Sequence, residues 1–169
     1  MSQEINKEVE ALIRGWGLPE ALKDKEGNVQ YQFSGRREVN GHEQTYRCED
    51  GDVKFCLYNK RNEQALFSMD FHKVSPRLLG LMNINEKPIT LQFLYVIDDS
   101  LRNKGIASFY VKKLQEYACD EGMDCINVVP YADLEISKNN KRNALSQTEL
   151  KKFYGKLSTP EMPIKLNLI

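Results

Sequence analysis

The sequence predicts a mixed α/β (α+β) fold: one central mixed sheet, antiparallel in its first half, with a parallel crossover in its second half and helices on both faces. Between residues 29 and 73, apolar and polar side chains alternate with a period of two, as in antiparallel strands. Residues 87–132 follow the order strand, helix, strand, which is typical of a right-handed parallel crossover. Helical periodicity appears before the first region and after the second.

Length and composition indicate an ordinary globular protein. The 169 residues are enough for one core, so we expect a single domain over residues 1–169. Lys+Arg and Asp+Glu both total 24, and this balance argues against a nucleic-acid partner, which needs a positive field. The N-terminus is polar and acidic, unlike a secretory signal, and no apolar run approaches the ~20 residues of a membrane span.

The cysteine and histidine spacing excludes two further classes. The four cysteines are scattered without a Cys-x-x-Cys pair, so we expect reduced thiols in a cytoplasmic protein, as a monomer or homodimer without a membrane partner. The two histidines lie far apart and show no ligand spacing, so we expect no metal site.

The first half begins with an amphipathic helix that ends at Gly17 and Pro19, and "LPEALKD" follows as a short second helix. The helix repeats apolar residues at helical spacing: Ile5, Val9, Leu12, Ile13 and Trp16. Strands are predicted at "VQYQFSG", "EQTYRCE", "VKFCLYNK" and "ALFSMDFHKV". Asp50-Gly51 is a strong hairpin signal between the second and third, whereas "NGHEQ", which contains His42, is interpreted as loop.

The second half begins with a short helix after Pro76. The segment "KPITLQFLYVID" is apolar on both faces, so we expect a central strand covered on both sides. The next helix has one apolar face, formed by Ile106, Tyr110, Leu114, Tyr117 and Ala118. A buried strand, "DCINVVPYA", and a polar loop follow. Ser146-Gln-Thr-Glu149 is a capping box that opens a last helix to Leu157, and "IKLNLI" is a terminal strand.

The most specific signal is "SLRNKGIASFY", where a buried strand leads directly into a helix. The first turn of a helix has unsatisfied N–H groups and partial positive charge, so such a junction can hold an anion. Gly105 allows close approach to the backbone, Ala107 and Ser108 are small, and Arg102 and Lys104 add charge at the rim. A diphosphate fits this description. The alternative is an ordinary loop with a turn glycine and two solvated cations.

The segment "VIDDSLRNKGIASFYVKKLQEYACDEGMDCINV" resembles motif A of the GNAT superfamily of N-acetyltransferases. That motif is a strand, then Arg/Gln-x-x-Gly-x-Gly/Ala, an amphipathic helix, a glycine turn and a second strand. Arg102, Gly105 and Ala107 match it, and Gly122 matches the turn. "KKFYGKL" resembles a later family segment and puts Tyr154 at the position of the family's tyrosine.

The resemblance covers roughly residues 88–157 and departs from the family at two points. Gln147 stands where many relatives have a coenzyme-contacting Asn, and Leu157-Ser158 stands where a Gly-Phe follows the tyrosine helix. The first half of the chain resembles the family only loosely.

The resemblance implies an acyl-CoA-dependent N-acetyltransferase that moves the acetyl group of acetyl-CoA to a primary amine by direct attack, without a metal. The pyrophosphate would be held by the loop and the first helical turn: Arg102, Asn103, Lys104, Gly105, Ile106, Ala107 and Ser108. The pantetheine arm would lie near Tyr95, Val96 and Ile97. A strand N–H near Ile97 would then polarise the thioester carbonyl.

Three side chains are candidates for proton transfer. The resemblance makes Tyr154 the donor to the leaving thiolate, because a phenol with a pKa of ~10 stays protonated at neutral pH; the alternative is aromatic packing. In "ALFSMDFHKV" strict alternation puts Asp70 and His72 on the face shared with Leu66 and opposite Ala65. Asp70 and His72 are therefore candidates for the base. The alternative is that both are ordinary polar side chains.

Two other functions are open at this stage. The runner-up is a non-catalytic GNAT-fold module that binds a CoA thioester or a protein partner. The third is a structural domain whose loop binds nothing. The amine acceptor, a small molecule or a protein amine, cannot be identified from the sequence.

Overall fold

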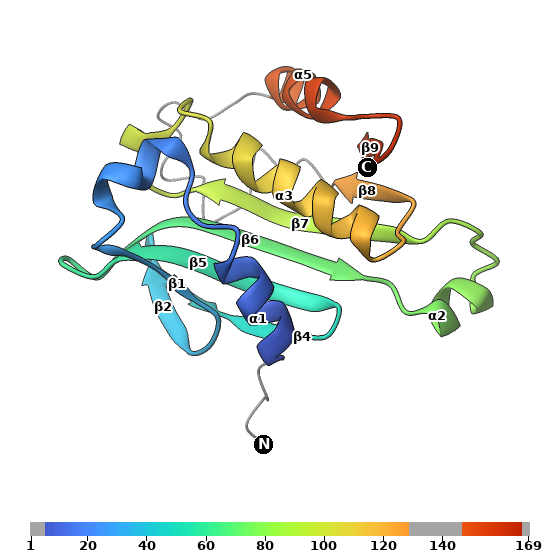
Figure 1. Cartoon of the computed structure of the whole chain (residues 1–169), viewed down its shortest axis with the longest axis horizontal. Helices are drawn as coiled ribbons and strands as arrows, with labels where there is room; N and C mark the ends of the chain where they lie inside the picture. Colours follow the sequence, from blue (N-terminus) through green and yellow to red (C-terminus); the bar gives the residue numbers. More distant parts are fainter. Residues whose placement is uncertain (1–5, 129–146, 167–169) are drawn as a thin grey trace.

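A computed structural model of the chain describes residues 6–128 and 147–166 and confirms the mixed sheet (Figure 1). The helices are α1 (Lys7–Arg14), η1 (Glu20–Lys25), α2 (Pro76–Leu81), η2 (Asp99–Leu101), α3 (Ile106–Asp120) and α5 (Gln147–Leu157). The strands are β1 (Val29–Gln32), β2 (Arg36–Val39), β3 (His42–Thr45), β4 (Arg47–Glu49), β5 (Asp52–Asn59), β6 (Gln64–Lys73), β7 (Pro88–Val96), β8 (Cys125–Val128) and β9 (Ile164–Leu166).

The main sheet has the order β1-β5-β6-β7-β8-β9, and β4 pairs with β5 beside β1. Pairing is antiparallel from β1 to β7 and parallel from β7 through β8 to β9. The predicted antiparallel half and parallel crossover are both confirmed. β2 and β3 form a separate two-stranded hairpin.

The described long helices share one face of the sheet. Ile13 of α1, Tyr110 of α3 and Tyr154 of α5 all belong to one buried cluster with the inward side chains of the strands. β8 and β9 are added on the same side of β7, so right-handed crossovers bring α3 and α5 to the same face. The predicted helices on the second face are not found among the described residues; the β2–β3 hairpin packs there, through Val39.

Aromatic side chains join the first helix to the sheet and to α3. The rings of Phe67 and Tyr110 stack with centroids 4.6 Å apart. The Tyr31 hydroxyl donates to the carbonyl oxygen of Gly17 at 2.7 Å and lies 2.8 Å from the Tyr110 hydroxyl. Trp16 packs at the edge of the same group. Burial of side chains of this size stabilises the fold by roughly 1.5–3 kcal/mol each.

Two hairpin turns set the first half of the fold. The predicted Asp50-Gly51 turn is confirmed, with Gly51 at φ 80° between β4 and β5. The assignment of His42 to a loop is wrong, because His42 begins β3 and pairs with Val39. Asn40 and Gly41, at φ 50° and 81°, form the tight turn whose two positive φ angles favour Asn-Gly.

An irregularity at the start of β6 changes the predicted faces of two residues. Leu57 pairs with Phe67 but Tyr58 pairs with Ala65, so Leu66 is an extra residue on β6. A bulge of one residue reverses the alternation beyond it. Leu66 therefore lies in the helix-side core and Ala65 packs with the hairpin, the reverse of the predicted assignment.

The remaining predictions concern the segment after β8, the buried face of α1, membrane spans, metal ligands and cysteines. The polar loop after β8 and Ser146 of the capping box lie outside the described residues. On α1, Ile13 is buried whereas Leu12 is 44% exposed, which differs from the predicted apolar face. Within residues 6–128 and 147–166, no helix has the length and apolarity needed to cross a membrane, and no cluster of potential metal ligands is found. The cysteines are free thiols.

Candidate functional site

The two edges of β7 are paired over different lengths. β8 pairs with β7 only from Pro88 to Leu91 among the described residues, whereas β6 pairs with β7 as far as Val96. Figure 1 shows β7 running on past the end of β8 toward the start of α3. The second half of β7 therefore has one edge bonded to β6 and another that the described part of β8 does not cover.

A bulge lies next to the last β7–β8 pair among the described residues. Asp70 of β6 pairs with Phe93, but the next residue, Phe71, pairs with Leu91, so Gln92 is an extra residue on β7. A bulge bends its strand and changes the direction of the following backbone groups. The bend in β7 therefore lies next to Leu91, the last residue of β7 that pairs with the described part of β8.

Backbone alternation identifies which N–H and C=O groups of β7 point to the edge opposite β6. The Ile97 N–H donates to the carbonyl oxygen of Leu66 at 2.8 Å, so Ile97 is directed toward β6. Successive residues of a strand direct their N–H and C=O groups to opposite edges, so Leu94 and Val96 are directed away from β6. The Ile97 N–H already donates to Leu66, so a strand N–H near Ile97 that meets a thioester carbonyl would have to come from a neighbouring residue.

The loop between β7 and α3 has an unusual backbone. Asn103 has φ 63° and Gly105 has φ 83°, both left-handed. A Cβ at Gly105 would meet no atom within 4 Å, so the requirement for glycine comes from backbone conformation and not from crowding. The space beside Gly105 is open.

The start of α3 provides donors at the same place. Gly105 is the N-cap, and its carbonyl oxygen accepts the first helical bond, from the Phe109 N–H at 3.0 Å. The N–H groups of Ile106, Ala107 and Ser108 have no acceptor within the helix, as in every first turn. No acidic residue lies in that turn, and the helix dipole favours negative charge there. These features match the predicted anion site.

Arg102 is not the rim charge that the sequence suggested. Arg102 is only 8% exposed, and its Nε donates to the carbonyl oxygen of Val96 at 2.9 Å. Its Nη2 donates to the Tyr95 hydroxyl at 3.0 Å. The guanidinium therefore ties the loop to the end of β7, while Lys104 is exposed on the loop surface.

Tyr154 lies on the helix side of the sheet, where it is 5% exposed and belongs to the buried cluster. The Gln115 side chain of α3 holds this region, because Nε2 donates to the carbonyl oxygens of Leu157 at 2.8 Å and Met162 at 3.1 Å. Burial raises the pKa of Tyr154 above its ordinary value of 10. The phenol is therefore protonated at neutral pH.

Asp70 and His72 lie on the other face, with the hairpin. Asp70 is 8% exposed and accepts from Arg47 Nη2 at 3.0 Å. Burial raises the pKa of Asp70, although Arg47 and Lys54 act to lower it. His72 pairs with Thr90, in the part of β7 that β8 still covers. Asp70 is therefore nearer to the bulge than His72, and neither shares a face with Tyr154.

Lys54 is a polar residue of this face that sequence reasoning did not select. It pairs with Asp70 across β5 and β6, and its Nζ donates to Gln44 Oε1 of the hairpin at 2.7 Å. Burial lowers its pKa. The period-two pattern of β5 already put Lys54 opposite the core face, so its place could have been read from the sequence. Its pairing with Asp70 depends on strand register, which the sequence does not show.

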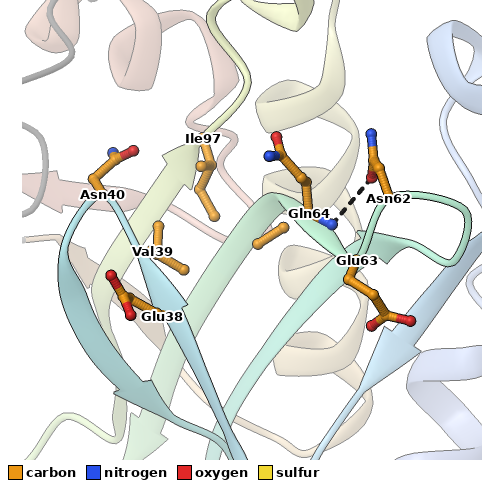
Figure 2. A pocket seen from close by; sticks show the side chains of 8 residues that line it. Glu38, Val39, Asn40, Asn62, Glu63, Gln64 and Ile97 are labelled. Atoms are coloured by element: carbon orange, nitrogen blue, oxygen red, sulfur yellow. Dashed lines mark hydrogen bonds between the residues drawn. The ribbon is translucent and has the colours of Figure 1, made fainter.

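A pocket of about 240 Å³ opens between the hairpin tip, the β5–β6 turn and the end of β7 (Figure 2). Its lining combines three apolar residues with five polar ones: Val39, Ala65 and Ile97, and Glu38, Asn40, Asn62, Glu63 and Gln64. Arg37 lies 3.5 Å from the Glu63 carboxylate, so one of the two acids is paired. The pocket adjoins the loop end of β7, not the bulge.

Comparisons with known proteins give a partial likeness in fold. No family model and no curated protein matches the chain. A tetramutant protein from Bacillus halodurans aligns at 19% identity and a TM-score of 0.43, over 64% of this chain and 59% of its own. The chain thus spans less than two thirds of that structure.

Two further solved structures are acetyltransferases. An aminoglycoside acetyltransferase from an uncultured soil metagenomic sample aligns at 16% identity and a TM-score of 0.44, over 72% of this chain and 67% of its own. A ribosomal-protein-alanine N-acetyltransferase from Brucella melitensis biovar Abortus aligns at 15% identity and a TM-score of 0.37, over 58% and 66%. At these values the likeness concerns parts of the fold.

Proposed function

We propose that this chain is an N-acetyltransferase that moves the acetyl group of acetyl-CoA to a primary amine. The observation that carries the proposal is the junction at the end of β7. β7 leads into a left-handed loop at Gly105, beside which the space is open, and then into the first turn of α3. Its motif resembles motif A of the GNAT superfamily. A diphosphate fits such a junction, because the first helical turn favours negative charge.

In this proposal, the backbone from Asn103 to Ser108 holds the pyrophosphate. The Arg102 N–H is excluded from the set, because it donates to the carbonyl oxygen of Asp99 at 3.3 Å. The pantetheine arm lies along the end of β7, near Tyr95, Val96 and Ile97, and its amides bond to the edge toward which Leu94 and Val96 are directed. The thioester then lies near the bulge at Gln92. That residue is further back along β7 than Val96, and the strand rises about 3.3 Å per residue.

The chemistry requires a neutral amine, since an alkylammonium with a pKa of ~10.4 has no lone pair to donate. The amine nitrogen attacks the thioester carbon, and a backbone N–H near the bulge stabilises the oxyanion by about 3–4 kcal/mol. The C–S bond breaks, the thiolate takes the Tyr154 proton, and the tyrosinate regains a proton from solvent before the next turnover. The amine proton passes to a base on the hairpin face. Asp70 is preferred over His72 for this role because it lies nearer to the bulge.

The second candidate is a non-catalytic module that binds a CoA thioester. Two observations favour it. Tyr154 is 5% exposed within the core, and Asp70 is already paired with Arg47. A buried phenol and a paired carboxylate are both compatible with purely structural roles.

A thiol-release assay separates the candidates. The protein is mixed with acetyl-CoA and, in turn, with small amines, aminoglycosides, amino acids, polyamines and peptides, and free CoA thiol is measured against a mixture without amine. Amine-dependent release supports the transferase. Calorimetric binding of acetyl-CoA without release supports the module. If the protein neither binds acetyl-CoA nor releases CoA thiol, only the structural domain remains.

A further inference from the structure

The hydroxyl of Tyr95 joins the end of β7 to the loop that follows it and to the distant β2–β3 hairpin. It accepts from Arg102 Nη2 at 3.0 Å, on the loop before α3, and from Asn40 Nδ2 at 3.3 Å, at the tip of the β2–β3 hairpin. A phenol oxygen can accept two hydrogen bonds while its own proton remains available. One oxygen atom of β7 therefore contacts both the anion loop and the hairpin.

The Arg102 side of this contact is a strong anchor. The guanidinium carbon lies 5.2 Å from the centroid of the Tyr95 ring, and Nε donates to the Val96 carbonyl oxygen at 2.9 Å. Hydrogen bonds from a charged donor are stronger than neutral ones. The loop needs such an anchor because Asn103 and Gly105 are both left-handed, a conformation that surrounding contacts must maintain.

The hairpin side is built from an apolar contact and an amide. Val39 and Ile97 form a small buried cluster against which Tyr95 packs. Asn40 follows Val39 directly and has φ 50°, so its amide projects from the turn itself. Figure 2 shows Asn40 beside Ile97 at the rim of the pocket. A shift of the hairpin tip would therefore move a hydrogen-bond partner of Tyr95.

We propose that Tyr95 is a positioning residue: its hydroxyl fixes the anion loop through Arg102 and transmits the position of the hairpin tip to that loop through Asn40. The hairpin thereby regulates the loop. The proposal rests on the proposed function for the identity of the ligand, acetyl-CoA. The ordering of the loop itself can be tested without any ligand.

The first experiment measures amide hydrogen exchange by NMR in the ligand-free protein. The Leu101 N–H donates to Asp98 and the Phe109 N–H to Gly105, both at 3.0 Å, so these two amides report the loop. Tyr95→Phe keeps the ring and removes the hydroxyl, and should raise both exchange rates about tenfold. The matched control is Tyr58→Phe on β5. It removes a hydroxyl that donates to Gln30 Oε1 at 3.0 Å and should leave both exchange rates unchanged.

The coupling to the hairpin is tested with Asn40→Gly, because glycine tolerates the positive φ and removes the side chain that donates to Tyr95. It should raise exchange at Leu101 and Phe109 about threefold. Adding it to Tyr95→Phe should change nothing further, because its effect passes through the hydroxyl. Additive effects, or no effect of Asn40→Gly, would overturn the coupling.

The positioning role is overturned if Tyr95→Phe and Tyr58→Phe give the same loop rates. It is also overturned if Leu114, in the middle of α3, accelerates as much as Phe109, because that result means general destabilisation. In turnover assays, Tyr95→Phe should raise KM for acetyl-CoA about tenfold with kcat unchanged. If the wild type does not bind acetyl-CoA, the proposed function fails, and the exchange rates still decide the positioning role.

Discussion

Arg47 of β4 reaches over β5 to the carboxylate of Asp70 on β6, with Nη2 3.0 Å from Oδ1. The same guanidinium donates through Nε to Asp52 at 2.9 Å. The two partners are buried to different extents, since the Asp70 side chain is 12% exposed and that of Asp52 is 41% exposed. Removal of Arg47 therefore leaves a mostly buried Asp70 carboxylate without this cation. Removal of the Asp70 charge leaves Arg47 bonded to Asp52.

Loss of Arg47 should cost more stability than loss of the Asp70 charge. Arg47→Met leaves a buried carboxylate without its closest cation, so we expect the free energy of unfolding to fall by about 2–3 kcal/mol. Asp70→Asn leaves Arg47 bonded to Asp52 and should cost about 1 kcal/mol. Urea unfolding at pH 7 measures both. Equal losses would mean that the pair is effectively solvated.

Asp70→Asn also tests the base. Because the fold should survive, a loss of kcat can be attributed to chemistry. We expect kcat to fall by about 10²-fold if Asp70 removes the amine proton, and to fall less in His72→Asn. The reverse order would move the base to His72.

Buried phenols should make the protein sensitive to alkali. Burial raises the pKa of Tyr31 to about 12 and raises that of Tyr110 further. The folded state thus holds these protons more tightly than the unfolded state, whose tyrosines have a pKa of ~10. Stability is full below about pH 10 and is lost as pH rises toward 12, by about 1.4 kcal/mol per pH unit for each phenol.

Tyr110→Phe should reduce this slope by about one such contribution. The measurement is the free energy of unfolding in urea at several values between pH 9 and 11. A variant with the wild-type slope would show that Tyr110 ionises as easily in the folded state as in the unfolded one.

The hydroxyl of Tyr154 is the proposed proton donor. Tyr154→Phe should leave acetyl-CoA affinity within a few fold and lower kcat by about 10²-fold. Steady-state kinetics with a single-turnover control measures this. Affinity lost together with stability would indicate packing alone, and an unchanged kcat with chemistry rate-limiting would remove Tyr154 from the mechanism.

The helix that carries Tyr154 depends on Gln115. Gln115→Leu keeps the volume but removes the donor of the Leu157 carbonyl oxygen, while the Met162 carbonyl oxygen keeps the Thr159 N–H and Oγ1, both at 3.4 Å. We expect a loss of about 2–3 kcal/mol in urea unfolding. A loss below about 0.5 kcal/mol would mean that water replaces the amide.

Periodicity predicted much of this fold because most elements follow one rule from end to end. The alternation of β5 and the apolar face of α3 both correspond to buried side chains, as Phe55 and Leu114 illustrate. Predictions failed where one residue breaks the period. This happens at Leu66, a bulge on β6 whose position depends on pairing with β5.

The candidate site was predicted in its backbone and not in its side chains. Gly105 and the start of α3 follow from local sequence rules, so the loop could be located in advance. The direction of Arg102 depends on acceptors at Val96 and Tyr95, which only the tertiary structure brings near. The Asn40-Gly41 turn was visible as a local signal, and its hairpin was missed because the polar strands beside it have no apolar alternation.

The central claim is that acetyl-CoA binds at the loop of Gly105, and calorimetric titration with acetyl-CoA tests it most directly. The wild type and Gly105→Ala are titrated together with Gly105→Glu. Alanine should cost about 1 kcal/mol of stability from the left-handed backbone and retain binding. Glutamate should abolish binding in a protein as stable as the alanine variant, because its side chain fills the diphosphate position with like charge. Unchanged affinity in the glutamate variant would contradict the account.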